Sequence, residues 1–262
     1  MAQNPWALTA GILGNIISFM VFLAPISTFY RIYKKRSTEG FQAVPYIVAL
    51  FSAMLWLYYA FIKTNVILLV IINSIGCVIE AIYIAIFLAY AHKKARVYAA
   101  KIILLLDGGL FSAIVLSTIA LAKGDTRVKV VGWICVGFAV CVFAAPLSIM
   151  KLVIATKSVE FMPFNLSFFL TISAVAWFSY GLLIKDLYVM LPNVLGFLFG
   201  LLQMILYVMY KKPNGGKKDE KEAVKKSIPI KTTSIDDEQK INTDEWTKQV
   251  KDNQENNNMT PV

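Results

Sequence analysis

Apolar residues dominate the first 210 positions and form long stretches separated by short polar segments. Each stretch has about 20 residues, which as a helix cross the roughly 30 Å of hydrocarbon in a bilayer. None is predicted to form strands, because an open sheet edge would leave backbone groups unpaired in lipid. The pattern predicts an all-α membrane protein with seven transmembrane helices, near residues 6–30, 43–62, 66–91, 100–122, 128–151, 164–184 and 187–210.

The sequence repeats itself at a distance of 121 residues. Residues of the same type recur in the first three and the last three stretches: Val21 with Val142, Ser52 with Ser173, Trp56 with Trp177, Tyr59 with Tyr180 and, after a one-residue slip, Asn73 with Asn193. A three-helix unit ends on the opposite side of the membrane from where it began, so an unpaired fourth helix restores the orientation. The predicted architecture is two parallel three-helix bundles joined by that fourth helix (3+1+3).

Composition separates a tail from the apolar part. Residues 211–262 hold 11 Lys and Arg, 10 Asp and Glu and few aliphatic side chains, so disorder is expected there. The apolar part keeps 15 basic residues, which gather on one predicted side of the membrane. That side is cytoplasmic by the positive-inside rule, which places the N-terminus outside and the C-terminus inside. The predicted domains are a first bundle, a linker helix, a second bundle and a cytoplasmic tail, at residues 1–97, 98–124, 125–210 and 211–262.

No constellation for catalysis or metal binding can be found in the sequence. The single histidine, His92, stands beside Lys93, and the three cysteines lie inside apolar runs. No nucleophile–base pair, phosphate-binding loop or carboxylate cluster can be assembled, so neither an enzyme nor a metal or other cofactor is predicted. No basic run is interleaved with aromatic residues, which argues against nucleic acid as a partner.

Two asparagines, Asn73 and Asn193, are predicted near mid-membrane, where an amide needs a hydrogen-bond partner or an aqueous cavity. One interpretation is that each amide joins neighbouring helices. Recurrence in both repeats favours a cavity, shared by the duplicated polar and aromatic residues Asn73, Asn193, Trp56, Trp177, Ser52 and Ser173. Amides suit hydroxyl groups, and an indole face suits the C–H side of a sugar ring. The set predicts a site for a neutral polyol.

Prolines and acids inside the apolar stretches add two further hypotheses. Pro25 and Pro146 lie several residues inside their stretches, which favours hinges, because proline removes a backbone donor and kinks a helix. Glu80 and Asp107 have no counterpart in the repeat, and either could bind a proton. Proton-coupled transport is therefore an alternative to passive transport.

Six motifs together identify a resemblance to the SWEET sugar transporters of plants, the MtN3/saliva family, across residues 6–210. They are Gly11-Ile12-Leu13-Gly14-Asn15, Phe22-Leu23-Ala24-Pro25, Lys35-Arg36-Ser37-Thr38-Glu39, Ala144-Ala145-Pro146-Leu147-Ser148-Ile149-Met150, Lys157-Ser158-Val159-Glu160-Phe161-Met162-Pro163-Phe164 and Leu191-Pro192-Asn193-Val194-Leu195-Gly196. Any one of them alone would be a weak signal, whereas the set is specific.

The resemblance implies a seven-helix facilitator that moves sugar down its gradient by alternating access. It assigns the mid-membrane pocket to positions matching Trp56, Asn73, Trp177 and Asn193. It assigns the tuning of pocket size to positions matching Val21, Ser52, Val142 and Ser173, where small residues resemble the sucrose-carrying clade. It assigns a hinge tetrad to Pro25, Pro45, Pro146 and Pro163, and an extracellular gate to Tyr59 and Asp186.

We therefore predict a bidirectional sucrose uniporter, with glucose as an alternative substrate, in the lipid bilayer of the plasma membrane. The resemblance also implies a homo-oligomer. A seven-helix receptor with the same topology is the alternative from another class. The repeat and the Pro192-Asn193 order, in place of an Asn-Pro pair, argue against it.

Overall fold

Helices account for nearly all of the described chain, which in this computed structural model comprises residues 4–160, 162 and 164–211. The helical elements are α1 (Pro5–Leu23), α2 (Ile26–Lys35), α3 (Val44–Ile62), α4 (Ile67–Tyr90), α5 (Lys93–Ile103), the π-helix η1 (Leu104–Leu110), α6 (Phe111–Leu121), α7 (Gly124–Val142), α8 (Ala144–Thr156), α9 (Phe164–Leu183) and α10 (Leu187–Tyr210). The predicted tail, apart from Lys211, lies outside the described residues.

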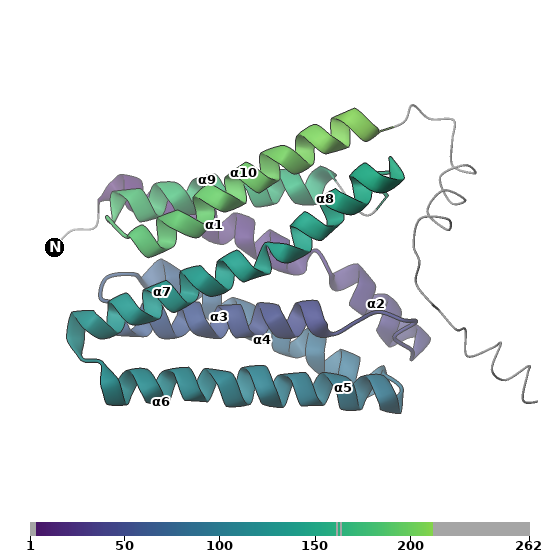
Figure 1. The fold of residues 1–262 in the computed structure, drawn as a ribbon, viewed down its shortest axis with the longest axis horizontal. Coiled ribbons are helices and arrows are strands. Elements are labelled where there is room, and N and C mark those ends of the chain that lie inside the picture. Colours follow the sequence, from purple (N-terminus) through teal and green to yellow (C-terminus); the bar gives the residue numbers. More distant parts are fainter. Residues whose placement is uncertain (1–3, 161, 163, 212–262) are drawn as a thin grey trace, which may run out of the picture. The chain divides into compact units, whose positions relative to one another are not determined.

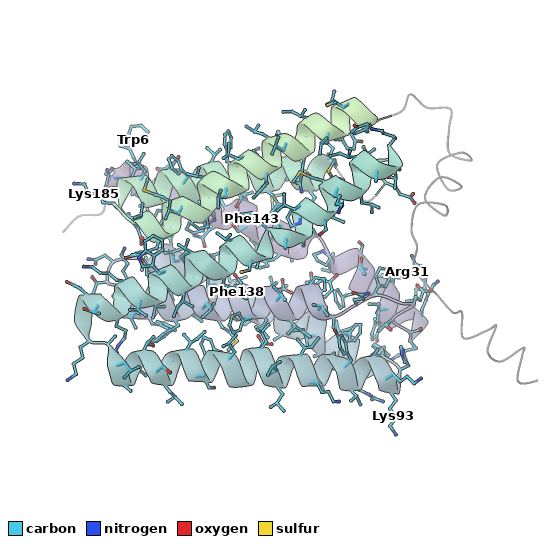
Figure 2. All side chains as sticks on the ribbon, in the orientation of Figure 1. Trp6, Arg31, Lys93, Phe138, Phe143 and Lys185 are labelled. Atoms are coloured by element: carbon cyan, nitrogen blue, oxygen red, sulfur yellow. The ribbon has the colours of Figure 1, made fainter. Side chains whose placement is uncertain are left out.

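Seven helical segments of the described residues are long and apolar enough to cross a membrane, which confirms the predicted fold class (Figure 1). Three of them combine consecutive helices and exceed the predicted stretches: Pro5–Lys35, Lys93–Leu121 and Gly124–Thr156. The extra turns carry basic side chains, and a hydropathy average therefore leaves these turns out of the predicted stretches. Long basic side chains at the end of a span can cover apolar surface with their stems while the charge reaches the headgroups. Figure 2 shows Arg31 and Lys93 at one end of the molecule and Trp6 and Lys185 at the other.

The six repeat-related spans form a ring. Within the first unit α4 packs against both α1 and α3, and within the second α10 packs against both α7 and α9. Across the units, α1 packs against α9 and α3 packs against α7. The order around the ring is therefore α1, α4, α3, α7, α10 and α9. The span without a repeat partner, α5–η1–α6, packs outside the ring, chiefly against α3 (Figure 1).

The repeat extends to the backbone at the basic end. Arg36 ends α2 with φ 54° and Lys157 ends α8 with φ 53°, both in the left-handed region. The Arg36 guanidinium donates to the Tyr90 hydroxyl, and the Lys157 ammonium donates to the Tyr210 hydroxyl at 3.0 Å. The two halves therefore share not only helices but also the contact that joins each loop to its third helix.

Two of the four prolines predicted as hinges stand at breaks in a span. Pro25 separates α1 from α2, and Pro146 is the third residue of α8, just past the end of α7. A proline has no N–H for the preceding turn, so each break follows from the sequence. At the first break, the Tyr83 hydroxyl donates to the Phe22 carbonyl at 2.9 Å. Pro45 begins α3, and Pro163 lies outside the described residues.

Candidate functional site: a cavity inside the ring

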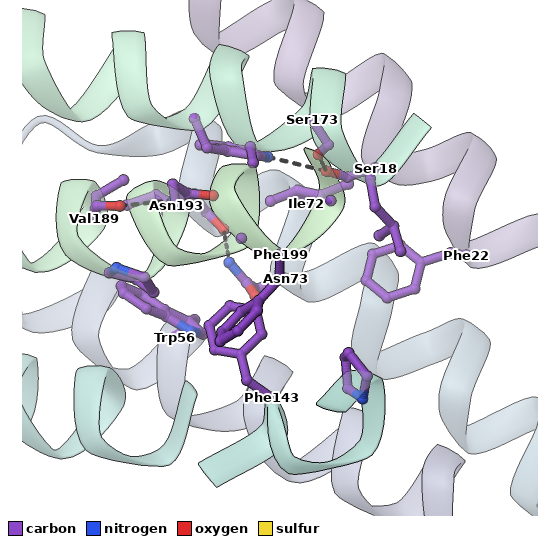
Figure 3. A pocket seen from close by; sticks show the side chains of 18 of the residues that line it. Ser18, Phe22, Trp56, Ile72, Asn73, Phe143, Ser173, Val189, Asn193 and Phe199 are labelled. Carbon is purple, nitrogen blue, oxygen red and sulfur yellow. Dashed lines mark hydrogen bonds between the residues drawn. The ribbon is translucent and has the colours of Figure 1, made fainter. Parts of the chain in front are cut away.

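A cavity of about 350 Å³ lies inside the ring and is lined by residues of both repeats (Figure 3). Its polar and indole groups come from α1, α3, α4, α9 and α10 and are Ser18, Trp56, Asn73, Ser173, Trp177, Asn193 and Gln203. Apolar side chains, among them Phe22, Phe143 and Phe199, form much of the remaining wall. A largely apolar cavity with a few convergent polar groups is typical of a small-molecule site.

The two asparagines are held in the same way. The Asn73 side-chain amide donates to the Leu69 carbonyl at 2.8 Å, and the Asn193 amide donates to the Val189 carbonyl at 2.7 Å. Each bond reaches back one turn of the asparagine's own helix and fixes the direction of the side chain. A primary amide has a second N–H and a carbonyl oxygen, so each asparagine retains donor and acceptor capacity for a ligand.

The two tryptophans share one contact and differ in another. Trp56 meets Tyr59 edge to face with ring centroids 5.7 Å apart, and Trp177 meets Tyr180 in the same way at 5.5 Å. The indole N–H of Trp177 also donates to the Ser18 hydroxyl at 3.0 Å. Ser18 in turn lies 3.1 Å from the Ser173 hydroxyl, so α1 and α9 position Trp177 together.

Five of the eight predicted substrate residues line this cavity: Trp56, Asn73, Ser173, Trp177 and Asn193. Val21, Ser52 and Val142 are not among its lining residues. Val142 ends α7 at the break in its span, with 37% of its surface exposed. The contribution of these three positions to pocket size stays a prediction.

A buried carboxylate lies near the cavity-lining residues Trp56 and Val189. The Tyr59 hydroxyl donates to Asp186 at 2.8 and 3.0 Å to its two oxygens, and the Lys63 ammonium donates to the same carboxylate. Asp186 also accepts the backbone N–H groups of Tyr188 and Val189 and so caps α10. The predicted pair Tyr59 and Asp186 therefore lies together and ties α3 to the start of α10.

Lys63 is absent from the predicted gate because the repeat carries no signal for it. Its counterpart 121 residues on is Ile184. At the other end, the cavity extends past Leu170 and Phe199 to Gln203, in the direction of the basic helix ends. The cavity thus reaches from the neighbourhood of Trp56 and Val189 toward the basic helix ends.

The two intramembrane acids lie away from the cavity. Glu80 in α4 is 5% exposed and Asp107 in η1 is 8% exposed, and neither lines the cavity. Within the described residues, one Glu80 oxygen and both Asp107 oxygens have no hydrogen-bond partner. Asp107 belongs to the span that packs outside the ring, so its carboxyl group is not part of the site.

Two copies of a three-helix unit, closed into a ring around a cavity with a few convergent polar groups, define a membrane transporter built from parallel repeats. A family described as "Sugar efflux transporter for intercellular exchange", MtN3/saliva, matches residues 9–95 and 129–215. These two matches fall on the two repeats and leave out all but the first three residues of the fourth span. The chain belongs to this family, the SWEET transporters.

Named relatives agree with this membership. "Bidirectional sugar transporter SWEET15" of Oryza sativa subsp. indica is 63% identical over 215 residues, which are 81% of this chain and 67% of the relative. "Bidirectional sugar transporter SWEET11" of Arabidopsis thaliana is 62% identical over 83% of this chain and 76% of its own. A solved structure of a eukaryotic SWEET transporter has a TM-score of 0.74 and 34% identity, covering 78% of this chain and 96% of its own.

Membership settles three of the predictions. The resemblance to SWEET transporters is confirmed. The family consists of sugar transporters, which confirms that the chain is not an enzyme and decides against the receptor alternative. It is a multi-pass membrane protein with seven spans in its described part.

Proposed function

We propose that this chain carries sucrose in both directions down its concentration gradient, by alternating access to the cavity inside the ring. The observation that carries the proposal is the cavity itself, with an asparagine and a tryptophan from each repeat on its wall. The printed names of the relatives describe bidirectional sugar transport. A volume of about 350 Å³ falls within the range of about 300–1,000 Å³ of small-molecule sites.

In this proposal, the amides of Asn73 and Asn193 bind sugar hydroxyls and the indoles of Trp56 and Trp177 contact the C–H faces of the rings. Neither pair carries a charge, which suits a neutral substrate that must also leave the site. Rocking of the two bundles at Pro25 and the matching prolines would open the end that Tyr59 and Asp186 close. Val21, Ser52 and Val142 would size the pocket in other stages of this cycle.

The basic end faces the cytoplasm in this proposal, which puts the N-terminus and the Lys63 end outside the cell. The proposed address is the plasma membrane, and copies of the chain are proposed to associate as a homo-oligomer. The cavity then opens toward the cytoplasm and is closed to the outside. Labelling of single cysteines introduced near Trp6 and near Lys211 by an impermeant reagent tests this orientation.

Flux of radiolabelled sucrose and glucose in the same proteoliposomes tests the substrate site. Asn73→Ala or Asn193→Ala should cut sucrose flux about tenfold or more, because a lost hydrogen bond leaves a buried sugar hydroxyl unpaired at a cost of about 1–3 kcal/mol. The matched control is Asn165→Ala, an exposed asparagine at the start of α9. Full sucrose flux in the Asn73 and Asn193 variants would refute the site, and faster glucose than sucrose flux in the unaltered chain would refute the preference.

A further inference from the structure

A second cavity lies outside the ring, beside the break in the first span. It has a volume of about 350 Å³ and is lined by α2 and α4, together with Leu23, the last residue of α1. The lining residues are apolar or aromatic: Leu23, Ile26, Phe29, Tyr30, Tyr33, Ile79, Ile82, Tyr83 and Ile86. Ile26, Tyr30 and Ile82 are each at least half exposed, so this groove opens toward the surrounding lipid. It cannot hold a sugar, because almost no polar atom faces it.

The groove has a rigid floor. Phe29 of α2 and Tyr83 of α4 stack with centroids 4.3 Å apart and planes 13° apart. Both rings are buried, and Tyr83 also donates to the Phe22 carbonyl at the break. The walls on α2 are Ile26, Tyr30 and Tyr33, which lie three or four residues apart and so share one face of the helix.

Cationic side chains stand where this face reaches the basic end of the molecule. Lys34 lies one turn past Tyr30, and the Arg36 guanidinium lies over the Tyr33 ring, 4.8 Å from its centroid. Arg31 and Lys35, one turn apart on α2, both pair with Glu39. Hydrogen bonds from Lys35 and Arg31 hold the pKa of Glu39 below its usual range. Glu39 therefore stays ionised and paired with these two cations.

We propose that the groove binds one anionic phospholipid, with an acyl chain against the Phe29–Tyr83 floor and the phosphate at Lys34 and Arg36. Lys34 belongs to none of the ion pairs among the described residues and is available for a headgroup. Basic residues at the membrane surface attract anionic lipid, and tyrosines favour the interface between hydrocarbon and headgroups.

The site belongs to one repeat only. The counterparts of Tyr30, Tyr33 and Tyr83 in the second repeat are Lys151, Ile154 and Gln203, which keep neither the aromatic floor nor the aromatic wall. The central cavity uses residues that the repeat duplicates, whereas this groove uses residues that it does not. The groove is therefore an addition to the duplicated transport unit.

A bound lipid would fix α2 against α4, its main packing partner. Because α2 is the half of the first span beyond Pro25, a lipid bound in the groove would restrict the movement of that half relative to α4. This consequence for transport rests on the proposed function, whereas lipid binding itself does not. Binding is therefore measured separately from flux.

Native mass spectrometry of the purified full chain, incubated with phosphatidylglycerol or phosphatidylcholine, tests the site. We expect one retained phosphatidylglycerol, bound about fivefold more weakly by Lys34→Gln and not weakened by Lys94→Gln, the exposed control. Ile82→Trp should fill the groove and abolish retention. The control Leu202→Trp changes the matching position of the second repeat, with 48% exposure against 50% for Ile82, and should retain the lipid.

Three results would overturn the proposal. They are equal retention of phosphatidylcholine, retention of an added sterol in place of phospholipid, and equal lipid loss in the two tryptophan variants. A change of oligomeric state in Ile82→Trp without lipid loss would assign the groove to a second copy of the chain instead. Loss of lipid with normal sugar flux would leave the site standing and remove only its role in transport.

Discussion

Trp177 and Trp56 hold matching places in the two repeats but are not held equally. The Trp177 indole N–H is bound by Ser18, whereas the residue 121 positions after Ser18 is Ala139, which has no hydroxyl to offer Trp56. Gly14 allows Trp177 to lie close to α1, because a Cβ there would be 3.0 Å from the indole. One wall of the cavity is thus fixed by side-chain bonds, and the opposite wall is not fixed in this way.

Ser18→Ala should raise the sucrose concentration for half-maximal flux roughly two- to tenfold, because one hydrogen bond contributes about 0.5–1.5 kcal/mol to orienting the indole. Concentration-dependent uptake into proteoliposomes measures the effect. The control is Ser179→Ala on the same helix as Trp177, whose hydroxyl donates only to its own helix, at the Val175 carbonyl. An unchanged concentration dependence in Ser18→Ala would show that the bond does not orient the ring for sugar.

Duplication determined which site residues could be predicted from the sequence. Asn73 and Asn193 are identifiable because each appears twice in an apolar setting, where chance polar residues are rare. Ser18 and Lys63 were missed because their counterparts are Ala139 and Ile184. Neither contact leaves a periodic signal in the sequence. One is the Ser18 hydroxyl that binds the Trp177 indole, and the other is the Lys63 ammonium that binds the Asp186 carboxylate. Their roles depend on helix packing, which the sequence pattern does not specify.

At the scale of helices, the two ends of the ring are built differently. The basic end repeats one contact, a cation on a tyrosine, in each half. At the opposite end the single carboxylate of Asp186 binds Tyr59 of α3 and Lys63 just past that helix, and caps α10. A single charged group that joins two helices can be removed by one substitution. We therefore expect one substitution to disrupt this end of the ring more than the basic end.

Asp186→Asn should reduce sucrose exchange at least tenfold, because it removes charge-assisted bonds to Tyr59 and leaves Lys63 without its partner. Breaking a buried ion pair by removing one partner costs about 3–5 kcal/mol, and the partial exposure of Lys63 places this case toward the lower end. The measurement is exchange of labelled for unlabelled sucrose. Asp125→Asn, an exposed acid in the first turn of α7, is the control.

A normal exchange rate in Asp186→Asn would show that the carboxylate caps α10 without acting as a gate.

The helices themselves were predictable to different degrees. Their number and apolar centres follow from hydropathy, and the break at Pro25 follows from proline chemistry. The π-helix around Asp107 was not predicted, since Gly108 and Gly109 permit it but do not require it.

For the whole molecule, the position of the fourth span bears on the mechanism. The ring of six helices encloses the cavity, while α5, η1 and α6 pack outside it. Asp107 therefore lies beyond the ring. Glu80 belongs to a ring helix, yet its carboxyl group does not line the cavity. Coupling requires a ligand and a proton to bias the same two-state element. Neither acid is among the residues that line the cavity, so neither would contact a bound sugar directly.

Sucrose counterflow should therefore persist when the pH gradient across the proteoliposome membrane is collapsed by a protonophore. Asp107→Asn and Glu80→Gln remove the titratable groups while nearly keeping their shapes, and both should leave the counterflow rate and its insensitivity to the gradient unchanged. Asn73→Ala serves as the control that lowers counterflow through the sugar site. Accumulation of sucrose against its gradient in the unaltered chain, lost in either acid variant, would assign that acid to proton coupling and replace uniport with symport.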